Sequence, residues 1–245
     1  MAVVKKRPNK CTVPSKFCPG CGHGIVARVV AEVIEEKGYE KSNIMTVAVG
    51  CSCNLYTLEG DLLQCAHGRA AASARGIKAV KPETLVISYQ GDGDAYVIGI
   101  EHTINAAYQK SNITMITINN SNFGMTGGQL AWTTLPGQYT TTTPHGRDVN
   151  GPLPIQVPEM IANNLSPAFV ARGSVVSPAE INKLKKYVSE AIDAQMNNEG
   201  FSMVEVICPC PTNWGMSIDK AYEHAANEIT KYYPLGILKA REGKE

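Results

Sequence analysis

Short apolar runs alternate with longer amphipathic stretches along most of the chain. The apolar runs have the length of buried strands and are bounded by glycine and polar residues. They lie at 45–49, 85–89, 113–118, 169–176 and 201–207. The stretches between them have helical periodicity, which predicts helices over 25–37, 70–78 and 96–109 and from Pro178 onward. This alternation predicts an α/β fold, a parallel sheet with helices on both faces.

The helix that begins at Pro178 has the clearest local signals. Ser177-Pro178-Ala179-Glu180 has the form of a capping box, with proline at the first helical position. A single apolar stripe follows, formed by Ile181, Leu184, Val188 and Ile192. A stripe of this period predicts a helix that buries one face.

Two regions depart from the regular pattern. Residues 119–158 are rich in glycine, threonine and proline, and a stretch of this length without periodicity is typical of a functional loop. Its aromatic residues Trp132 and Tyr139 suit either core packing or a partner interface. The charged tail from Ser217 predicts a helix that docks on the outside or on a partner. We expect one domain over 1–245, with a cysteine-rich N-terminal segment and a C-terminal docking tail.

Composition and charge exclude several classes of protein. The chain has 245 residues, is 44% hydrophobic and has a formal net charge of +1, so it can bury a full core. It has no basic stripe that would predict nucleic-acid binding, and no run of about 18 apolar residues that would predict a membrane span. Because no apolar stretch follows the basic residues of 1–10, we expect no secretory signal and a cytoplasmic protein.

The chain's eight cysteines are too sparse for a disulfide scaffold. Most of them neighbour glycine, proline or serine, as loop residues do, which indicates a metal or cluster site. Cys18 and Cys21 form a C-x-x-C pair, and Cys208 and Cys210 form a C-x-C pair. From the residues alone, structural zinc and an iron–sulfur cluster are equally open, because both bind four thiolates.

Two polar turns follow successive apolar runs. Gly91-Asp92-Gly93-Asp94 ends one predicted strand, and Asn119-Asn120 ends the next. The carboxyl ends of parallel strands meet at one edge of a sheet, where ligands bind. Glycine allows close approach to a diphosphate, and carboxylate and amide oxygens suit Mg²⁺. The two turns together therefore predict a Mg²⁺–diphosphate site.

The spacing of these two turns, across one helix and one strand, resembles the thiamine-diphosphate fingerprint. The wider sequence resembles the β subunits of 2-oxoacid:ferredoxin oxidoreductases, and it matches them in order from 17 to 213. The matching segments are Phe17-Cys18-Pro19-Gly20-Cys21-Gly22-His23-Gly24, Gly50-Cys51-Ser52, His67-Gly68-Arg69, Gly91-Asp92-Gly93-Asp94, Phe123-Gly124-Met125-Thr126 with Gly128-Gln129, and Cys210-Pro211-Thr212-Asn213. The resemblance implies the α/β thiamine-diphosphate-binding fold.

The resemblance also implies the residues of the cofactor site. Asp92, Asn120 and the backbone carbonyl of Asn122 correspond to the Mg²⁺ ligands, although this chain has Asn119-Asn120 where the family usually has Asp-Asn. His67 is expected beside the cofactor as a catalytic residue. The other positions expected around thiamine diphosphate are Gly50, Ser52, Gly91, Gly93, Asp94, Gly124, Met125 and Thr126.

For the cysteines, the resemblance implies a 4Fe–4S cluster. Its four expected ligands are Cys18, Cys21, Cys51 and Cys210. Cys53 and Cys208 each lie two residues from an expected ligand and are the open alternatives. Cys11 and Cys65 are expected to be ordinary thiols.

The activity implied is oxidative decarboxylation of a 2-oxo acid to an acyl-coenzyme A and CO₂, with reversible reduction of ferredoxin. In the family an α subunit supplies the pyrimidine-side domain and the activating glutamate. Some members add small γ and δ subunits, one of them ferredoxin-like. The lone chain is therefore expected to be half of an enzyme.

The substrate class is open between a branched-chain 2-oxo acid and 2-oxoglutarate. Many archaeal relatives have lysines where this chain has Asn54 and Gly127, which removes cationic partners for a second carboxylate. Two other functions stay as alternatives: a subunit of a non-oxidative thiamine-dependent lyase or synthase, and a zinc-stabilised α/β module without catalysis.

Overall fold

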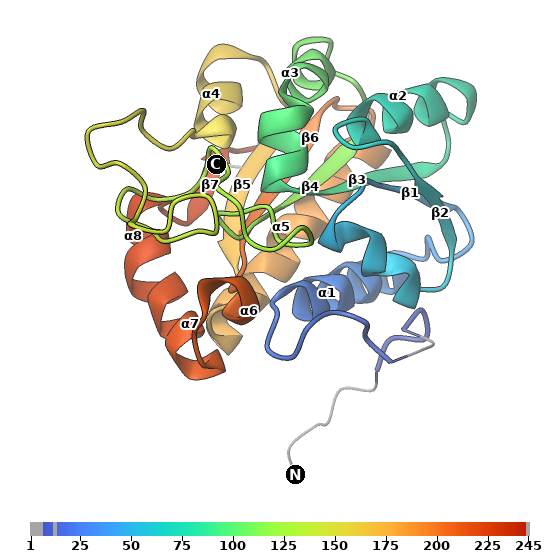
Figure 1. Cartoon of the computed structure of the whole chain (residues 1–245). Helices are drawn as coiled ribbons and strands as arrows, with labels where there is room; N and C mark the ends of the chain where they lie inside the picture. The colour runs from blue at the N-terminus through green and yellow to red at the C-terminus, as the bar shows by residue number, and fades with distance from the viewer. Residues whose placement is uncertain (1–6, 12–13, 244–245) are drawn as a thin grey trace.

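The computed structural model describes residues 7–11 and 14–243 (Figure 1). A seven-stranded sheet runs through the molecule in the order β2-β1-β3-β4-β6-β5-β7. All neighbouring strands pair in parallel except β5 and β7. The strands are β1 (Asn43–Val47), β2 (Asp61–Gln64), β3 (Leu85–Gly91), β4 (Thr114–Asn119), β5 (Phe169–Ser174), β6 (Ser202–Ile207) and β7 (Gly236–Lys239).

Helices cover both faces of the sheet (Figure 1). The longer ones are α1 (His23–Glu36), α2 (Ala70–Val80), α3 (Ile100–Tyr108), α4 (Val157–Asn164) and α5 (Pro178–Met196). Successive strand residues point to opposite faces: Ile87 packs in the core that includes α1 and α5, whereas Val86 packs in the core that includes α2, α3 and α4. The predicted α/β fold, with a parallel sheet and helices on both faces, is confirmed.

All the strands that the pattern predicted are formed, and their ends lie within two residues of the predicted positions. The capping box also forms, since Ser177 Oγ accepts the Glu180 N–H at 3.3 Å and Pro178 opens α5. The helix predicted over 96–109 differs: a π-helical turn, η2 (Gly93–Ile98), precedes α3. Gly99 joins the two, and it lies so close to Gly68 that a Cβ would come within 2.4 Å of the Gly68 carbonyl.

The C-terminal tail forms more than the predicted helix. After α6 (Pro211–Trp214) come α7 (Ile218–His224), η3 (Ala225–Ile229) and α8 (Thr230–Tyr232). Ile229 and Tyr233 bury their side chains with Ile207 in a small core of their own. Strand β7 then pairs antiparallel with β5, so the tail is part of the sheet. The pattern missed β7 and β2 because edge strands are short and partly exposed.

The chain places its chemistry at one edge of the sheet. The carboxyl ends of β1, β3, β4 and β6 lead into the 3₁₀ turn η1 (Cys51–Thr57), the Gly-Asp-Gly turn, the Asn-rich turn and the second cysteine pair, respectively. Within 7–11 and 14–243, no helix is both long enough and apolar enough to cross a membrane. Residues 1–6 of the basic N-terminal stretch lie outside the described residues.

Candidate cofactor site

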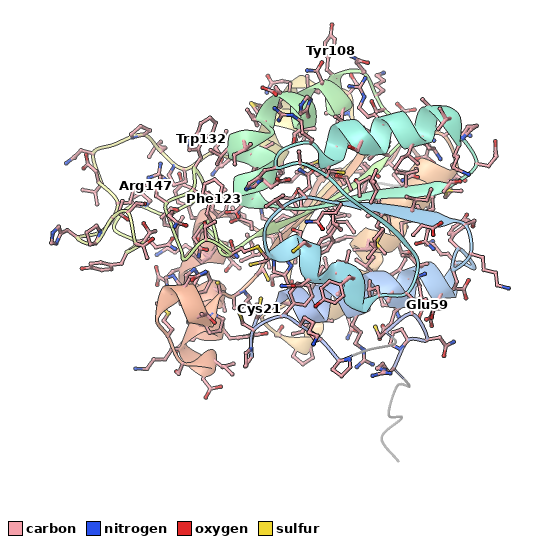
Figure 2. The ribbon with its side chains drawn as sticks, turned by 45° about the vertical axis from the view of Figure 1, so that its right-hand side comes forward. Cys21, Glu59, Tyr108, Phe123, Trp132 and Arg147 are labelled. Carbon is pink, nitrogen blue, oxygen red and sulfur yellow. The ribbon has the colours of Figure 1, made fainter. Side chains whose placement is uncertain are left out.

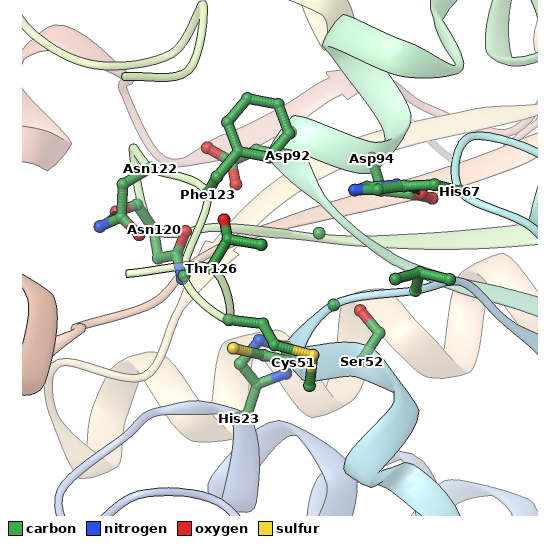
Figure 3. A pocket seen from close by; sticks show the side chains of 16 residues that line it. His23, Cys51, Ser52, His67, Asp92, Asp94, Asn120, Asn122, Phe123 and Thr126 are labelled. Carbon is green, nitrogen blue, oxygen red and sulfur yellow. Dashed lines mark hydrogen bonds and ion pairs between the residues drawn. The ribbon is translucent and has the colours of Figure 1, made fainter. Parts of the chain in front are cut away.

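A cavity that is partly open to solvent lies at this edge of the sheet. It brings together every residue expected at the Mg²⁺ and diphosphate sites (Figure 3). His23, Val49, Cys51 and Phe123 complete its lining. None of these four was expected to line the cofactor cavity, although His23, Cys51 and Phe123 lie within the matching motifs.

Two turns close on each other to form the cavity wall. The ring of Phe123 lies against Gly93, where an added Cβ would come within 2.5 Å of it. Phe123 also pairs by hydrogen bonding with Gln129, which closes the 123–129 loop. Only glycine at 93 therefore allows the Gly-Asp-Gly turn and the Phe-Gly-Met-Thr turn to meet.

Three oxygen atoms converge at the predicted metal position. Asn120 Oδ1 lies 2.8 Å from the Asn122 carbonyl oxygen and 3.1 Å from Asp92 Oδ1, with no donor between them. Rotating the amide would turn both contacts into hydrogen bonds. Mg²⁺ holds oxygens at about 2.1 Å in an octahedron, which puts neighbouring ligands roughly 3 Å apart. Both distances from Asn120 Oδ1 match this spacing, so these residues fit the metal.

Asp92 has the properties of a carboxylate that needs a cation. Its side chain is buried, and burial outweighs the hydrogen bond from Thr133 and raises the pKa of Asp92 to about 7. A divalent cation favours the ionised form and would displace the proton. Thr133 lies in the long loop and was not predicted as a site residue; only the absence of regular structure over 119–158 pointed to that loop.

Asp94 faces His67. Its buried carboxylate accepts hydrogen bonds from the backbone N–H of Gly68, from Gln90 Nε2 and from His67 Nδ1. Figure 3 shows the two side chains side by side at the cavity wall. The carboxylate expected near the diphosphate is therefore occupied by His67, and it fixes the orientation of that ring.

The position of His67 depends on close backbone packing. Gly68 adopts φ of +78°, and a Cβ there would lie 2.9 Å from the backbone of Ile98 and Gly99. The His67 ring also meets Phe123 edge-on, with centroids 6.1 Å apart. His67 remains partly exposed to the cavity, so its second nitrogen is available to a ligand.

A second histidine, His23, lines the cavity from below (Figure 3). It is fully buried, lies 3.0 Å from the Tyr89 hydroxyl through Nδ1, and stacks on Phe17. Burial lowers its pKa to about 3, so the ring is neutral at neutral pH. It can bind a ligand as a donor or acceptor but not as a cation.

The four cysteines expected at a cluster lie near one another. Burial, together with the neighbouring thiols of Cys21, Cys210, Cys18 and Cys53, raises the pKa of Cys51 to about 12. Cys18 is exposed and Cys210 is buried. Within the described part of the chain, no three histidine, cysteine or acidic side chains converge on a position for a single metal ion. The thiols thus form a loose group beside the cavity.

Cys208 also belongs to this neighbourhood. It is completely buried, and its Sγ lies where a Cβ on Gly22 would come within 2.6 Å. A hydrogen bond with Cys208 lowers the pKa of Cys21, while burial and that bond raise the pKa of Cys208 well above its usual value. The structure thus places both members of the C-x-C pair close to the other thiols.

Comparisons with known proteins agree with this geometry. The family model "Thiamine pyrophosphate enzyme, C-terminal TPP binding domain" matches residues 48–206. The 2-oxoglutarate synthase subunit KorB of Archaeoglobus fulgidus is 38% identical over 203 residues, which are 82% of this chain and 72% of that subunit. The chain belongs to the 2-oxoacid:ferredoxin oxidoreductase subunits.

Two further relatives define its extent. The ketoisovalerate oxidoreductase subunit VorA of Methanothermobacter marburgensis is 35% identical over 244 residues, 99% of this chain but 51% of that subunit. A solved 2-oxoglutarate:ferredoxin oxidoreductase from Magnetococcus marinus, with 2-oxoglutarate, coenzyme A and succinyl-CoA bound, has a TM-score of 0.76 at 26% identity and covers 97% of this chain and 86% of its own. The chain therefore spans about half the length of one relative, and the predicted family and fold are confirmed.

In this oxidoreductase subunit, one short loop connects the thiols to the predicted metal turn. Asn213 Nδ2 donates to the Gly124 carbonyl at 2.8 Å and lies 3.6 Å from Cys210 Sγ. Trp214 Nε1 donates to the Asn120 carbonyl at 3.1 Å. Residues 210–214 therefore hold the Cys210 thiol beside the Asn120 and Gly124 backbone.

The long loop of the subunit presents aromatic residues to solvent. Trp132 is 44% exposed and Tyr139 is 69% exposed. Core packing, the simpler role considered for each, is therefore wrong for both residues in this chain. Their predicted role at a partner interface stays a prediction.

Proposed function

We propose that this chain is the thiamine-diphosphate- and 4Fe–4S-binding β subunit of a heteromeric 2-oxoacid:ferredoxin oxidoreductase. The complete enzyme would decarboxylate a 2-oxo acid oxidatively to an acyl-coenzyme A and CO₂, reduce ferredoxin, and run reversibly. The observation that carries this proposal is the position of Cys51, which lines the cofactor cavity and also neighbours the other thiols. A cluster held there would lie directly beside the cofactor.

The residues of this chain have distinct roles in that function. Asp92, Asn120 and the Asn122 carbonyl would hold Mg²⁺, and Gly93 leaves room for the Phe123 ring at the cavity wall. Bound thiamine diphosphate supplies the electron sink for decarboxylation. His67, oriented by Asp94, can hold or move a proton at Nε2.

The neighbouring walls limit access to water. Phe123 and the neutral ring of His23 line the cavity on two sides. Gly50, with φ of +121°, turns the chain from β1 to Cys51, so that Ser52 reaches the same cavity. This arrangement leaves the cavity partly open to solvent, and the side chain of Met125 in its wall is 47% exposed.

Two observations support the partners that we propose: the cavity is partly open to solvent, and the chain spans only 51% of one relative. An α subunit would cover the cavity with the pyrimidine-side domain and contribute the activating glutamate. Small γ and δ subunits would complete the assembly, and ferredoxin would accept the electrons. The relatives' names support a branched-chain 2-oxo acid or 2-oxoglutarate as substrate.

The test is anaerobic expression of the chain with and without a co-expressed α subunit. We expect iron and sulfide in a 4Fe–4S ratio, bound thiamine diphosphate, and coenzyme-A-dependent dye reduction from a 2-oxo acid in the co-expressed sample only. Zinc without thiamine would favour the non-catalytic module. Decarboxylation without iron would favour a non-oxidative lyase or synthase. Turnover by the lone chain at a comparable rate would overturn the half-enzyme proposal.

A further inference from the structure

Thr133, in the long loop, contacts the predicted metal ligand directly. Its Oγ1 donates a hydrogen bond to Asp92 Oδ2, and both side chains are buried. The other carboxylate oxygen, Asp92 Oδ1, is the one that lies 3.1 Å from Asn120 Oδ1. Holding Oδ2 thus fixes the plane of the carboxylate and aims Oδ1 at the point where the three oxygens converge.

Thr133 is itself held from the C-terminal segment. The hydroxyl of Tyr233 donates to the Thr133 carbonyl at 3.0 Å. The Tyr233 ring lies under the guanidinium of Arg172, whose carbon is 5.2 Å from the ring centroid. Both side chains are fully buried, so water does not compete for these contacts.

The same arginine also supports the turn that carries Asn120. Arg172 Nε donates to Glu205 Oε2, while its two terminal nitrogens donate to the carboxylate of Glu159. Glu205 Oε1 accepts from Asn119 Nδ2 at 3.1 Å, and Asn119 directly precedes Asn120. The turn that carries Asp92 and the turn that carries Asn120 are therefore both connected to one buried ion-pair network.

We propose that Thr133 is a positioning residue for the metal site: it orients Asp92, and the Tyr233–Arg172–Glu205 network holds it in register with Asn120. This role rests on the proposed cofactor function. It makes metal affinity depend on Thr133 and on the C-terminal segment, neither of which supplies any of the three oxygens. Partners of metal ligands of this kind usually change metal affinity by about 10–100-fold when removed.

The test is the Mg²⁺ concentration that half-saturates cofactor binding. Cofactor-stripped full-length protein, prepared anaerobically, is titrated with Mg²⁺ at saturating thiamine diphosphate. Tryptophan fluorescence reports binding, because Trp132 precedes Thr133 and Trp214 contacts Asn120. We expect Thr133→Val, which has the same shape without the hydroxyl, to raise the half-saturating concentration by about 10–100-fold. Thr133→Ser retains the hydroxyl and should bind like the wild type.

A matched control separates positioning from general loss of stability. Thr46 is a buried threonine of β1 whose hydroxyl donates to the Ala70 carbonyl at 2.9 Å, away from the metal turn. Thr46→Val should lower the melting temperature but leave the Mg²⁺ requirement unchanged. An equal loss of Mg²⁺ affinity in Thr46→Val, or none in Thr133→Val, overturns the proposal.

Two further variants cover the remaining outcomes. If Thr133→Val does not fold, Tyr233→Phe removes only the hydroxyl on the Thr133 carbonyl and should raise the Mg²⁺ requirement in the same direction by a smaller factor; no change overturns the proposal. Asp92→Ala tests the proposed function itself. Normal loading in Asp92→Ala would contradict the metal site, whereas loss in Asp92→Ala with normal loading in Thr133→Val would contradict only the role of Thr133.

Discussion

Asp92 and Asp94 lie two positions apart in one turn and have different partners. Asp92 directs one oxygen at Asn120 and accepts a hydrogen bond from Thr133 with the other. Asp94 is surrounded by the donors Gly68 N, Gln90 Nε2 and His67 Nδ1. The first therefore suits a cation, and the second holds a histidine, because the donors around each carboxylate decide what it can bind.

The thiols also allow a prediction for single residues. We expect Cys210→Ser to lose most of its iron and visible absorbance, because serine replaces a soft thiolate ligand. The measurement is iron and sulfide content with the visible spectrum after anaerobic purification. Cys11→Ser and Cys65→Ser are the controls and should keep the cluster.

Cys208 makes the outcome decisive. It hydrogen-bonds Cys21 and is completely buried, so it is the nearest competitor for the fourth ligand position. A full cluster in Cys210→Ser together with its loss in Cys208→Ser would show that the assigned ligand is wrong.

His23 predicts a pH effect on stability. Its pKa falls from 6.5 to about 3 on folding because the ring is buried. Between these two pH values the ring is protonated in the unfolded chain and neutral in the folded chain. This contribution is fully present above pH 6.5 and is lost as the pH falls toward 3, at about 1.4 kcal/mol per pH unit. Denaturant unfolding of the full chain should show a shallower acid loss in His23→Gln.

The exposed His145 gives the control for this effect. His145→Gln also removes one histidine but leaves no buried ring. A difference between His23→Gln and wild type no larger than that between His145→Gln and wild type would contradict the assignment.

At the scale of elements, the site depends on turns that pack at the ends of parallel strands. The β3 and β4 turns meet through Gly93 and Phe123, and the β6 turn contacts the 123–126 turn through Asn213. No single strand carries the cavity. Because these turns contact one another, a substitution in one turn should change the positions of the others.

Gly93→Ala is the prediction for this scale. The new methyl group would overlap the Phe123 ring, which should cost about 1–3 kcal/mol and weaken cofactor binding, as overpacking does. Denaturant unfolding and thiamine diphosphate titration measure the two effects. Gly76→Ala is the control, because its Cβ would meet nothing within 4 Å and alanine favours the α2 helix by about 0.5–1 kcal/mol.

At the scale of the whole molecule, the long loop projects to one side, away from the end of α3 (Figure 2). Trp132 lies on that loop, and Tyr108 lies at the end of α3. Tyr139 and Tyr108 have nearly equal exposed fractions, 69% and 72%. Equal exposure on different faces allows the predicted partner interface to be tested with one residue type.

We expect Tyr139→Ser to weaken assembly with the α subunit by about 2 kcal/mol or more, as loss of an aromatic anchor does. Tyr108→Ser should leave assembly unchanged. Analytical ultracentrifugation of the co-expressed complexes measures both. Equal effects of the two substitutions, or no effect of Tyr139→Ser, would remove the long loop from the interface.

The sequence by itself determined the alternation of strands and helices, the capped helix at Pro178, and the turns that carry Asp92, Asn120 and Cys51. These features depend on local periodicity and on residue types that neighbours along the chain already specify. The edge strands β2 and β7 could not be predicted from the sequence, because each has only four residues and these are partly exposed. Neither did the partners of the buried polar groups.

Only the tertiary structure decided that Asp94 holds His67, that Thr133 holds Asp92, and that Trp132 faces solvent. Each contact joins residues from different elements, and the π-helical turn at Gly93 and its contact with Gly68 depend on backbone packing that no local pattern encodes. Burial gives Asp92 and His23 their shifted pKa values, and burial is a property of the assembled sheet and loops. The residue types thus came from the sequence, and their chemical states came from the fold.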